Sequence, residues 1–296
     1  MLSLRYAYIS WSNDINACGP AFLDRNSHLI TCLFLGPRSL FSLLFLFLFL
    51  DLISMSDEHQ PWTYVWIPIL GGFVWFSTLL SMLITWLATG RPHYVSMQGS
   101  IACISDIGAD ILKPLFIVGC TITAVCFFLS LCIERGLRHV GRLVPYMRAR
   151  ERVFGYLSIF GSFIGSCGII LLSIFDTKRY TSLHQVFLFM FMLGVAISVI
   201  FTVIEFRWLS RDFQHVRTLK IAYLAKAIIA TLLILLVFAF AIAYYQSPHV
   251  GAILEWIVAF GFTLYLLTFV FDLRQSKGVQ RRQLSAENLR RAIMIG

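Results

Sequence analysis

Charge is scarce in this sequence. Only 13% of the residues are Asp, Glu, Lys or Arg, whereas a soluble domain uses about a quarter to cover its surface. Hydrophobic residues make up 58% of the chain, and they gather in apolar runs of about 20 residues, the length that crosses a hydrocarbon core of about 30 Å. A soluble fold is therefore excluded. The composition predicts an all-α, polytopic membrane protein.

Sequence patterns that signal metal binding or covalent chemistry are missing too. The seven cysteines include no C-x-x-C pair, which excludes a zinc site of that kind. No H-E-x-x-H, H-x-x-x-H, G-x-S-x-G or glycine-rich phosphate loop occurs. Four cysteines, at 120, 126, 132 and 167, lie inside apolar runs and are expected to act as small apolar side chains. We therefore predict no metal, no cofactor and no catalytic residue of a known motif.

Six apolar segments predict six transmembrane helices packed as an antiparallel bundle. They cover residues 65–87, 115–133, 153–175, 186–206, 221–245 and 252–271. At a rise of about 1.5 Å per residue, each can cross a bilayer with modest tilt. The connections are short, so we expect one membrane domain over residues 55–275. In the third segment, Gly161 and Gly165 predict a close helix–helix contact inside the bundle, with a dimer contact as the alternative.

Residues 1–54 fit this bundle poorly. The apolar run at 40–50 would span only about 16 Å as a helix, against a core of about 30 Å. Residues 55–58 (MSDE) are typical of a polar N-terminus ahead of a first span. We expect residues 1–54 to be a poorly structured extension, which an upstream start in the gene model would also produce. The alternative is an interfacial segment or a weak seventh span.

Lysine and arginine are nearly absent from alternate loops, which predicts an orientation. Segments 88–112, 176–185 and 246–251 hold one, two and no basic residues, whereas 134–152, 207–220 and 272–296 hold six, four and six. This alternation is typical of six spans with both ends in the cytosol. The net charge of +9 is then explained by topology, and no nucleic-acid partner is expected.

The basic segments also predict contacts with anionic lipid. Lys and Arg beside a span attract an anionic leaflet by about 1 kcal/mol per residue. Candidate contacts for phosphatidylserine or phosphoinositides are Arg148, Arg150, Arg152, Arg274, and in the basic cytosolic tail (276–296) Lys277, Arg281 and Arg282. The alternative is that these charges only set the topology. Within the spans, Lys226 is expected to form a salt bridge with Glu205 or Asp272.

Polar side chains near the predicted outer ends of the spans form the candidate site. They are Asp106, Asp110, Lys113, Asp176, His184 and Glu255. Carboxylates with a histidine suit acid/base chemistry or a hard cation. Glu255 lies a turn inside the sixth span, where a carboxylate is costly without a partner such as His184 or Lys113. The alternative, which we favour, is that these residues cap helices, bind head groups or position a ligand.

Short motifs are spread across the six spans. They are ISDIGAD (104–110), KPLFI (113–117), FD (175–176) with His184, FTVIE (201–205), EW (255–256) and DLR (272–274). In this order they resemble the Frag/DRAM/Sfk family of six-span membrane proteins, which is related to the N-terminal region of the CWH-type GPI-lipid remodelling proteins. ISDIGAD and EW are most similar to the fungal Sfk-like branch.

The resemblance implies a regulator of membrane lipids. Sfk-like members imply a non-enzymatic protein of the plasma membrane that organises lipids or assists a peripheral phosphoinositide kinase complex. DRAM-like members imply an autophagy modulator in endolysosomal or vacuolar membranes. The CWH-type relatives imply a lipid-remodelling enzyme, in ER or Golgi membranes, with a carboxylate/histidine site on the outer face. Membrane lipids are the expected ligands under each alternative.

Overall fold

The computed structural model describes residues 62–97, 99–143, 149–212 and 217–276. The extension predicted for residues 1–54 lies outside this part of the chain. So do the tail beyond residue 276 and four of the predicted lipid contacts, Arg148, Lys277, Arg281 and Arg282.

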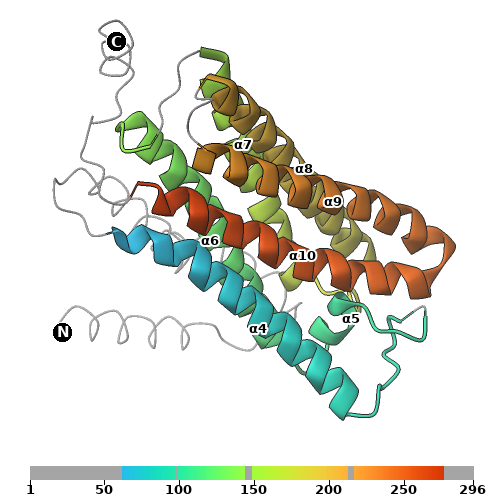
Figure 1. The fold of residues 1–296 in the computed structure, drawn as a ribbon. Coiled ribbons are helices and arrows are strands. Elements are labelled where there is room, and N and C mark those ends of the chain that lie inside the picture. Colours follow the sequence, from blue (N-terminus) through green and yellow to red (C-terminus); the bar gives the residue numbers. More distant parts are fainter. Residues whose placement is uncertain (1–61, 98, 144–148, 213–216, 277–296) are drawn as a thin grey trace, which may run out of the picture. The chain divides into compact units, whose positions relative to one another are not determined.

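The described chain is a bundle of helices (Figure 1). A single turn, η1 (Trp62–Val65), leads into α4 (Trp66–Ala88), and a short helix, α5 (Ile104–Gly108), follows a loop. The remaining helices are α6 (Lys113–His139), α7 (Ala149–Ile174), α8 (Thr181–Asp212), α9 (Arg217–Gln246) and α10 (Pro248–Arg274). Within the described residues, α4 and α6 to α10 are six helices that are long and apolar enough to cross a membrane. The predicted all-α, six-span membrane bundle is confirmed.

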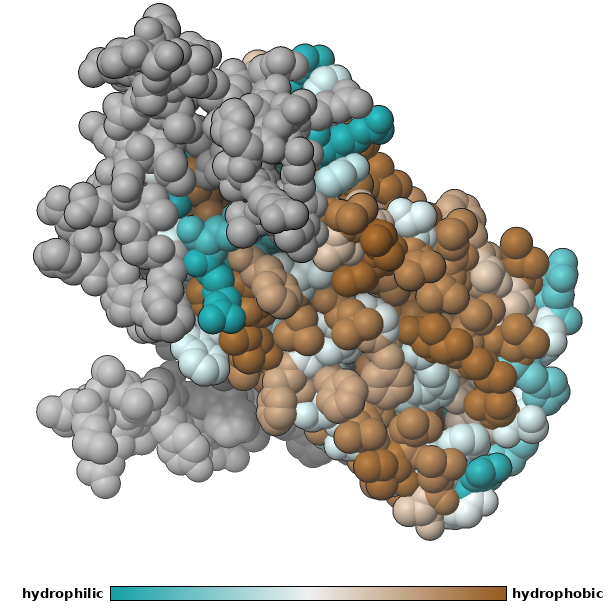
Figure 2. Space-filling view, in the orientation of Figure 1, coloured by the Kyte–Doolittle hydropathy of each residue, from teal (hydrophilic) through white to brown (hydrophobic). Residues whose placement is uncertain are grey.

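The six spans form a closed ring. Each packs against the next in the chain, and α10 returns to pack against α4. The contact between α8 and α9 is the least extensive of the six. Aromatic rings fill the centre, where Phe127 of α6 lies edge-on to Phe262, Tyr265 and Phe269 of α10. Figure 2 shows apolar residues across the middle of the visible face, as lipid contact requires.

The ring has two chemically different ends. One, here called the α5 end, carries α5, the loop before it, the α7–α8 turn and the α9–α10 turn. The other, here called the arginine end, carries the ends of α6, α8 and α10 and the start of α7. The positive-inside pattern predicts that the arginine end faces the cytosol and the α5 end faces away from it.

The helices extend beyond the apolar segments, and this corrects one feature of the predicted loops. The second span ends at His139 rather than near residue 133, so Arg135 and Arg138 belong to α6 and not to a basic loop. Both side chains are buried, with 7% and 4% of their surface exposed. Hydropathy ends a span at the first charges, but these arginines have buried carboxylate partners and the helix continues.

The third and fourth spans touch backbone to backbone. A Cβ placed on Gly161 would lie 2.6 Å from the backbone nitrogen of Ser198 on α8, and one on Gly165 would lie 3.1 Å from that of Val195. Opposite them, a Cβ on Gly194 would lie 2.3 Å from the backbone nitrogen of Gly165. The structure thus places both glycines between α7 and α8. The Ser158 hydroxyl crosses the same contact to donate to the Ser198 carbonyl at 3.0 Å.

This contact gives a test of packing. We expect Gly161→Ala to lower the free energy of unfolding by about 1–3 kcal/mol, because the added methyl forces the α7 and α8 backbones apart. The control is Gly136→Ala on α6, where a Cβ meets nothing within 4 Å and where alanine favours the helix. Thermal unfolding in detergent measures both. Equal melting temperatures for the two variants would contradict the close contact.

Candidate functional site

A polar chamber of about 300 Å³ lies at the α5 end. Its walls come from the loop before α5, from α5, from the α7–α8 turn and the start of α8, and from the end of α9 and the start of α10. Three of the six predicted site residues line it, namely Asp106, His184 and Glu255. The structure therefore brings together one side chain from each of the three loops or helix ends that the topology placed at this end.

Asp106 joins α5 to the loop before it. Its Oδ2 accepts a hydrogen bond from the backbone N–H of Cys103 at 3.0 Å, and its Oδ1 accepts one from the Ser96 hydroxyl at 2.6 Å. Only 5% of the residue is exposed. A carboxylate at the third position of a helix that bonds back to the N-cap amide is typical of a helix start. Asp106 thus shapes the chamber as well as lining it.

Glu255 lies in the second turn of α10 and is also buried. Its carboxyl is next to the Cys103 thiol and to the backbone N–H groups of Ile104 and Ser105, where the start of α5 favours negative charge. Lys113, one partner considered from the sequence, bonds elsewhere. Burial, followed by the charges of Glu255 and Asp106, raises the pKa of the Cys103 thiol well above its usual range. This cysteine is therefore a poor nucleophile.

His184 presents a hydrogen-bond acceptor to the chamber. Its Nδ1 lies 3.0 Å from the carbonyl oxygen of Leu172 and 2.9 Å from that of Phe175. Carbonyl oxygens only accept, so we infer that Nδ1 carries the proton and that Nε2 of the neutral ring is an acceptor. The residue is 3% exposed, and its Nε2 has no hydrogen-bond partner among the described residues.

The other three predicted site residues lie outside the chamber. Lys113 Nζ bonds to Asp176 Oδ2 at 2.5 Å, and the backbone N–H of Arg179 donates to Asp176 Oδ1 at 2.8 Å. Burial raises the pKa of Asp176, but the hydrogen bonds from Lys113 and Arg179 outweigh it, and the pKa is below its ordinary value. This pair fastens the start of α6 to the α7–α8 turn. Asp110 is exposed.

The loop before α5 is also fastened to α10. The indole Nε1 of Trp256 donates to the carbonyl oxygen of Ala102 at 3.0 Å. At the start of α10, His249 Nδ1 accepts from the backbone N–H of Ser100 at 2.9 Å. The loop that lines the chamber is therefore held by two side chains of the last span.

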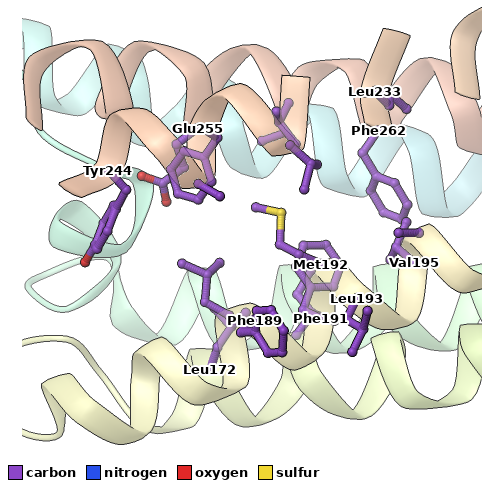
Figure 3. Close-up of a pocket in the computed structure, with 18 of the residues that line it drawn as sticks. Leu172, Phe189, Phe191, Met192, Leu193, Val195, Leu233, Tyr244, Glu255 and Phe262 are labelled. Carbon is purple, nitrogen blue, oxygen red and sulfur yellow. The ribbon is translucent and has the colours of Figure 1, made fainter. Parts of the chain in front are cut away.

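An apolar cavity of about 320 Å³ adjoins the chamber (Figure 3). Leu188, Tyr244 and Glu255 line both spaces, and Figure 3 shows Met192 pointing into the cavity. The other walls are mainly side chains of α8, α9 and α10. Phe189 and Phe238, which also line it, are 67% and 66% exposed. The cavity therefore reaches the outer surface of the bundle, where α8 and α9 make their limited contact and lipid would lie.

A second polar cluster, which sequence reasoning recognised only in part, lies buried near the arginine end. Arg135 bonds to Glu134 and to Glu205, each at 2.5 Å. Arg138 bonds to Glu134 at 2.8 Å. Glu134 and Glu205 are fully buried. These ion pairs join α6 to α8.

Lys226 extends this cluster to the last two helices. Its ammonium bonds to Asp272, one of the two partners expected from the sequence, and joins α9 to α10. It also lies 4.5 Å from the ring centre of Phe206 and 4.1 Å from that of Phe269. A buried ammonium with a carboxylate and two aromatic faces is electrostatically compensated.

The predicted lipid contacts that the structure describes are on the surface of the arginine end. Arg150, Arg152 and Arg274 are exposed. The guanidinium of Arg150 also lies 4.3 Å from the ring centre of Trp208 on α8. These residues are accessible to head groups, in contrast to the buried Arg135 and Arg138.

Comparison with known proteins agrees with this architecture. The family model described as the Frag1/DRAM/Sfk1/Cwh43P N-terminal domain matches residues 63–276, which include all six spans and both cavities. The chain belongs to this family. It is 26% identical over 225 residues to Protein sfk1 of Schizosaccharomyces pombe, covering 74% of this chain and 68% of that one. It is 24% identical over 187 residues to Protein SFK1 of Saccharomyces cerevisiae, covering 53% of each. No solved structure matches this chain significantly.

The two named relatives agree with the predicted fungal Sfk-like branch. With the six apolar helices, they show an integral, multi-pass membrane protein of the Frag1/DRAM/Sfk1 family.

Proposed function

We propose that this protein binds a single membrane lipid at its α5 end and, without catalysis, regulates how lipids are organised in its membrane. One observation carries the proposal: a polar chamber and an apolar cavity share the wall formed by Leu188, Tyr244 and Glu255. A phospholipid likewise joins a polar head group to apolar acyl chains, one of which could enter the cavity. At about 300 and 320 Å³, each space lies at the lower end of the range that ligand sites occupy.

The arginine end gives this regulator a second contact with lipid. Arg150, Arg152 and Arg274 are exposed beside the spans, where each adds about 1 kcal/mol of attraction to an anionic leaflet. We propose that this end binds phosphatidylserine or phosphoinositide head groups on the cytosolic side. In the plasma membrane, it would thereby assist a peripheral phosphoinositide kinase complex. The names of the two relatives support the family but say nothing of such a partner.

Native mass spectrometry of the full chain tests lipid binding. The protein is released from nanodiscs that contain a mixture of natural phospholipids. We expect one phospholipid to stay bound after mild activation, because its head group and one acyl chain are held in two adjoining spaces of the bundle. A protein that retains no lipid, or only a graded series of annular lipids without a preferred single adduct, would overturn the proposal.

A lipid-remodelling enzyme is the second candidate. The observation that favours it is that Asp106, His184 and Glu255 line one chamber, with Nε2 of His184 available as an acceptor. The same nanodiscs distinguish the two functions. Conversion of a lipid or GPI anchor to a new species by the wild type, lost in His184→Gln, would show the enzyme; bound but unchanged lipid supports the regulator.

A further inference from the structure

Acceptors outnumber cations in the polar chamber. Asp106 and Glu255 bring two carboxyl groups, and His184 brings the lone pair of Nε2. Lys178 is the one Lys or Arg among the described residues that line the space, and its side chain is exposed rather than buried. Lys113, the one Lys or Arg in the predicted cluster, is bonded to Asp176. The interior of the chamber therefore favours a ligand that is positively charged and donates hydrogen bonds.

The hydrogen bonds that these side chains already form show which acceptor lone pairs are left for a ligand. Asp106 uses one lone pair on each oxygen for Ser96 and Cys103 and retains others. Within the described part of the chain, no donor reaches the Nε2 of His184, although only 3% of this residue is exposed. A buried acceptor without a donor costs about 1–3 kcal/mol, so a bound N–H group removes an existing penalty.

We propose that the chamber binds a primary ammonium group, the head group of an ethanolamine phospholipid. This inference rests on the proposed lipid-binding function and names the class of lipid. The ammonium donates its N–H groups to the carboxylates of Asp106 and Glu255 and to Nε2 of His184. The phosphate lies toward the exposed Lys178, and one acyl chain enters the cavity past Leu188.

The lining of the chamber distinguishes ethanolamine from choline. A quaternary ammonium has no N–H to donate and is bound in proteins by a cage of aromatic faces. Tyr244 is the one Phe, Tyr or Trp among the described residues that line the chamber. This lining therefore favours a primary ammonium, which donates hydrogen bonds, over a quaternary ammonium, which carries only charge.

A methylation series of lipids tests the proposal. The full-length protein, in detergent and stripped of lipid, is titrated with phosphatidylethanolamine, its N-methyl and N,N-dimethyl derivatives and phosphatidylcholine, all with identical chains. Charge stays constant along the series while N–H donors are removed. We expect affinity to fall at each step and phosphatidylcholine to bind about tenfold or more weakly than phosphatidylethanolamine. Soluble O-phosphoethanolamine serves as a further arm.

Single substitutions test whether the preference for phosphatidylethanolamine arises from the residues that line the chamber. Glu255→Gln and His184→Phe should each bring phosphatidylethanolamine close to the affinity of phosphatidylcholine. Asp110→Asn removes an exposed carboxylate from the turn between α5 and α6, outside the chamber, and should leave the preference unchanged. Equal binding along the series by the folded wild type would overturn the ethanolamine assignment while leaving lipid binding intact. No binding of any lipid would overturn the proposed function itself. Soluble phosphoethanolamine that competes as well as the lipid would show an amine site that does not use the apolar cavity.

Discussion

Replacing Arg135 with methionine is expected to lower the free energy of unfolding by about 3–5 kcal/mol, the usual cost of removing one partner from a buried ion pair. The guanidinium bonds to Glu134 and Glu205 at 2.5 Å each. Both carboxylates are fully buried, so the variant leaves negative charge without its nearest counterion. Chemical denaturation in mixed micelles, or thermal unfolding in detergent, measures the loss.

The matched control is Arg150→Met at the same end of the bundle. Arg150 is exposed and contacts the ring of Trp208, so its loss should cost less than about 1 kcal/mol. The double variant Arg135→Met, Glu205→Gln should recover part of the stability lost in Arg135→Met, because one charge of each sign is removed and Glu134 keeps its ion pair with Arg138. If Arg135→Met is as stable as Arg150→Met, the buried network does not hold α6 to α8.

Filling the apolar cavity is expected to reduce lipid retention strongly without unfolding the protein. Ala196 of α8 lines the cavity and is only partly buried. In Ala196→Trp the indole occupies the space assigned to an acyl chain. We expect the bound-lipid fraction in native mass spectra to fall by about tenfold or more, equivalent to at least about 1.4 kcal/mol of binding free energy.

The control for this variant is Val186→Trp, also on α8. Val186 is 58% exposed and lines neither space, so its indole should lie among the membrane lipids and leave retention unchanged. A lipid adduct of normal abundance in Ala196→Trp, with the melting temperature of the wild type, would place the bound lipid outside the cavity and contradict the proposed site.

Topology was predictable from the sequence because it depends on sums over many residues. The lengths of the apolar segments identify the spans. The alternation of loops rich in Lys and Arg with loops that have few of them places three distant segments at one end of the bundle. That reasoning alone is sufficient to bring Asp106, His184 and Glu255 near one another, and the structure places them around one chamber.

The ion pairs between side chains were harder to predict, because each depends on two particular residues that are far apart in the chain. Arg135 belongs by composition to a basic loop, yet it bonds to Glu205, 70 positions away. Lys113 was a possible partner of Glu255 from the sequence. It forms a salt bridge with Asp176 instead, because the start of α6 meets the α7–α8 turn. Apolar residues around the cavity, such as Met192 and Val237, do not differ in the sequence from residues that face lipid or core. Whether they enclose a space depends on helix positions that hydropathy does not specify.

The fastening of the loop before α5 by Trp256 and His249 has a consequence for how strongly and how selectively the chamber binds. A loop that is already ordered loses little conformational entropy when a ligand arrives, so more of the contact energy is retained as affinity. It also resists reshaping around a bulkier head group. Under the proposed function, selectivity among lipids would then be a property of the protein before the lipid binds.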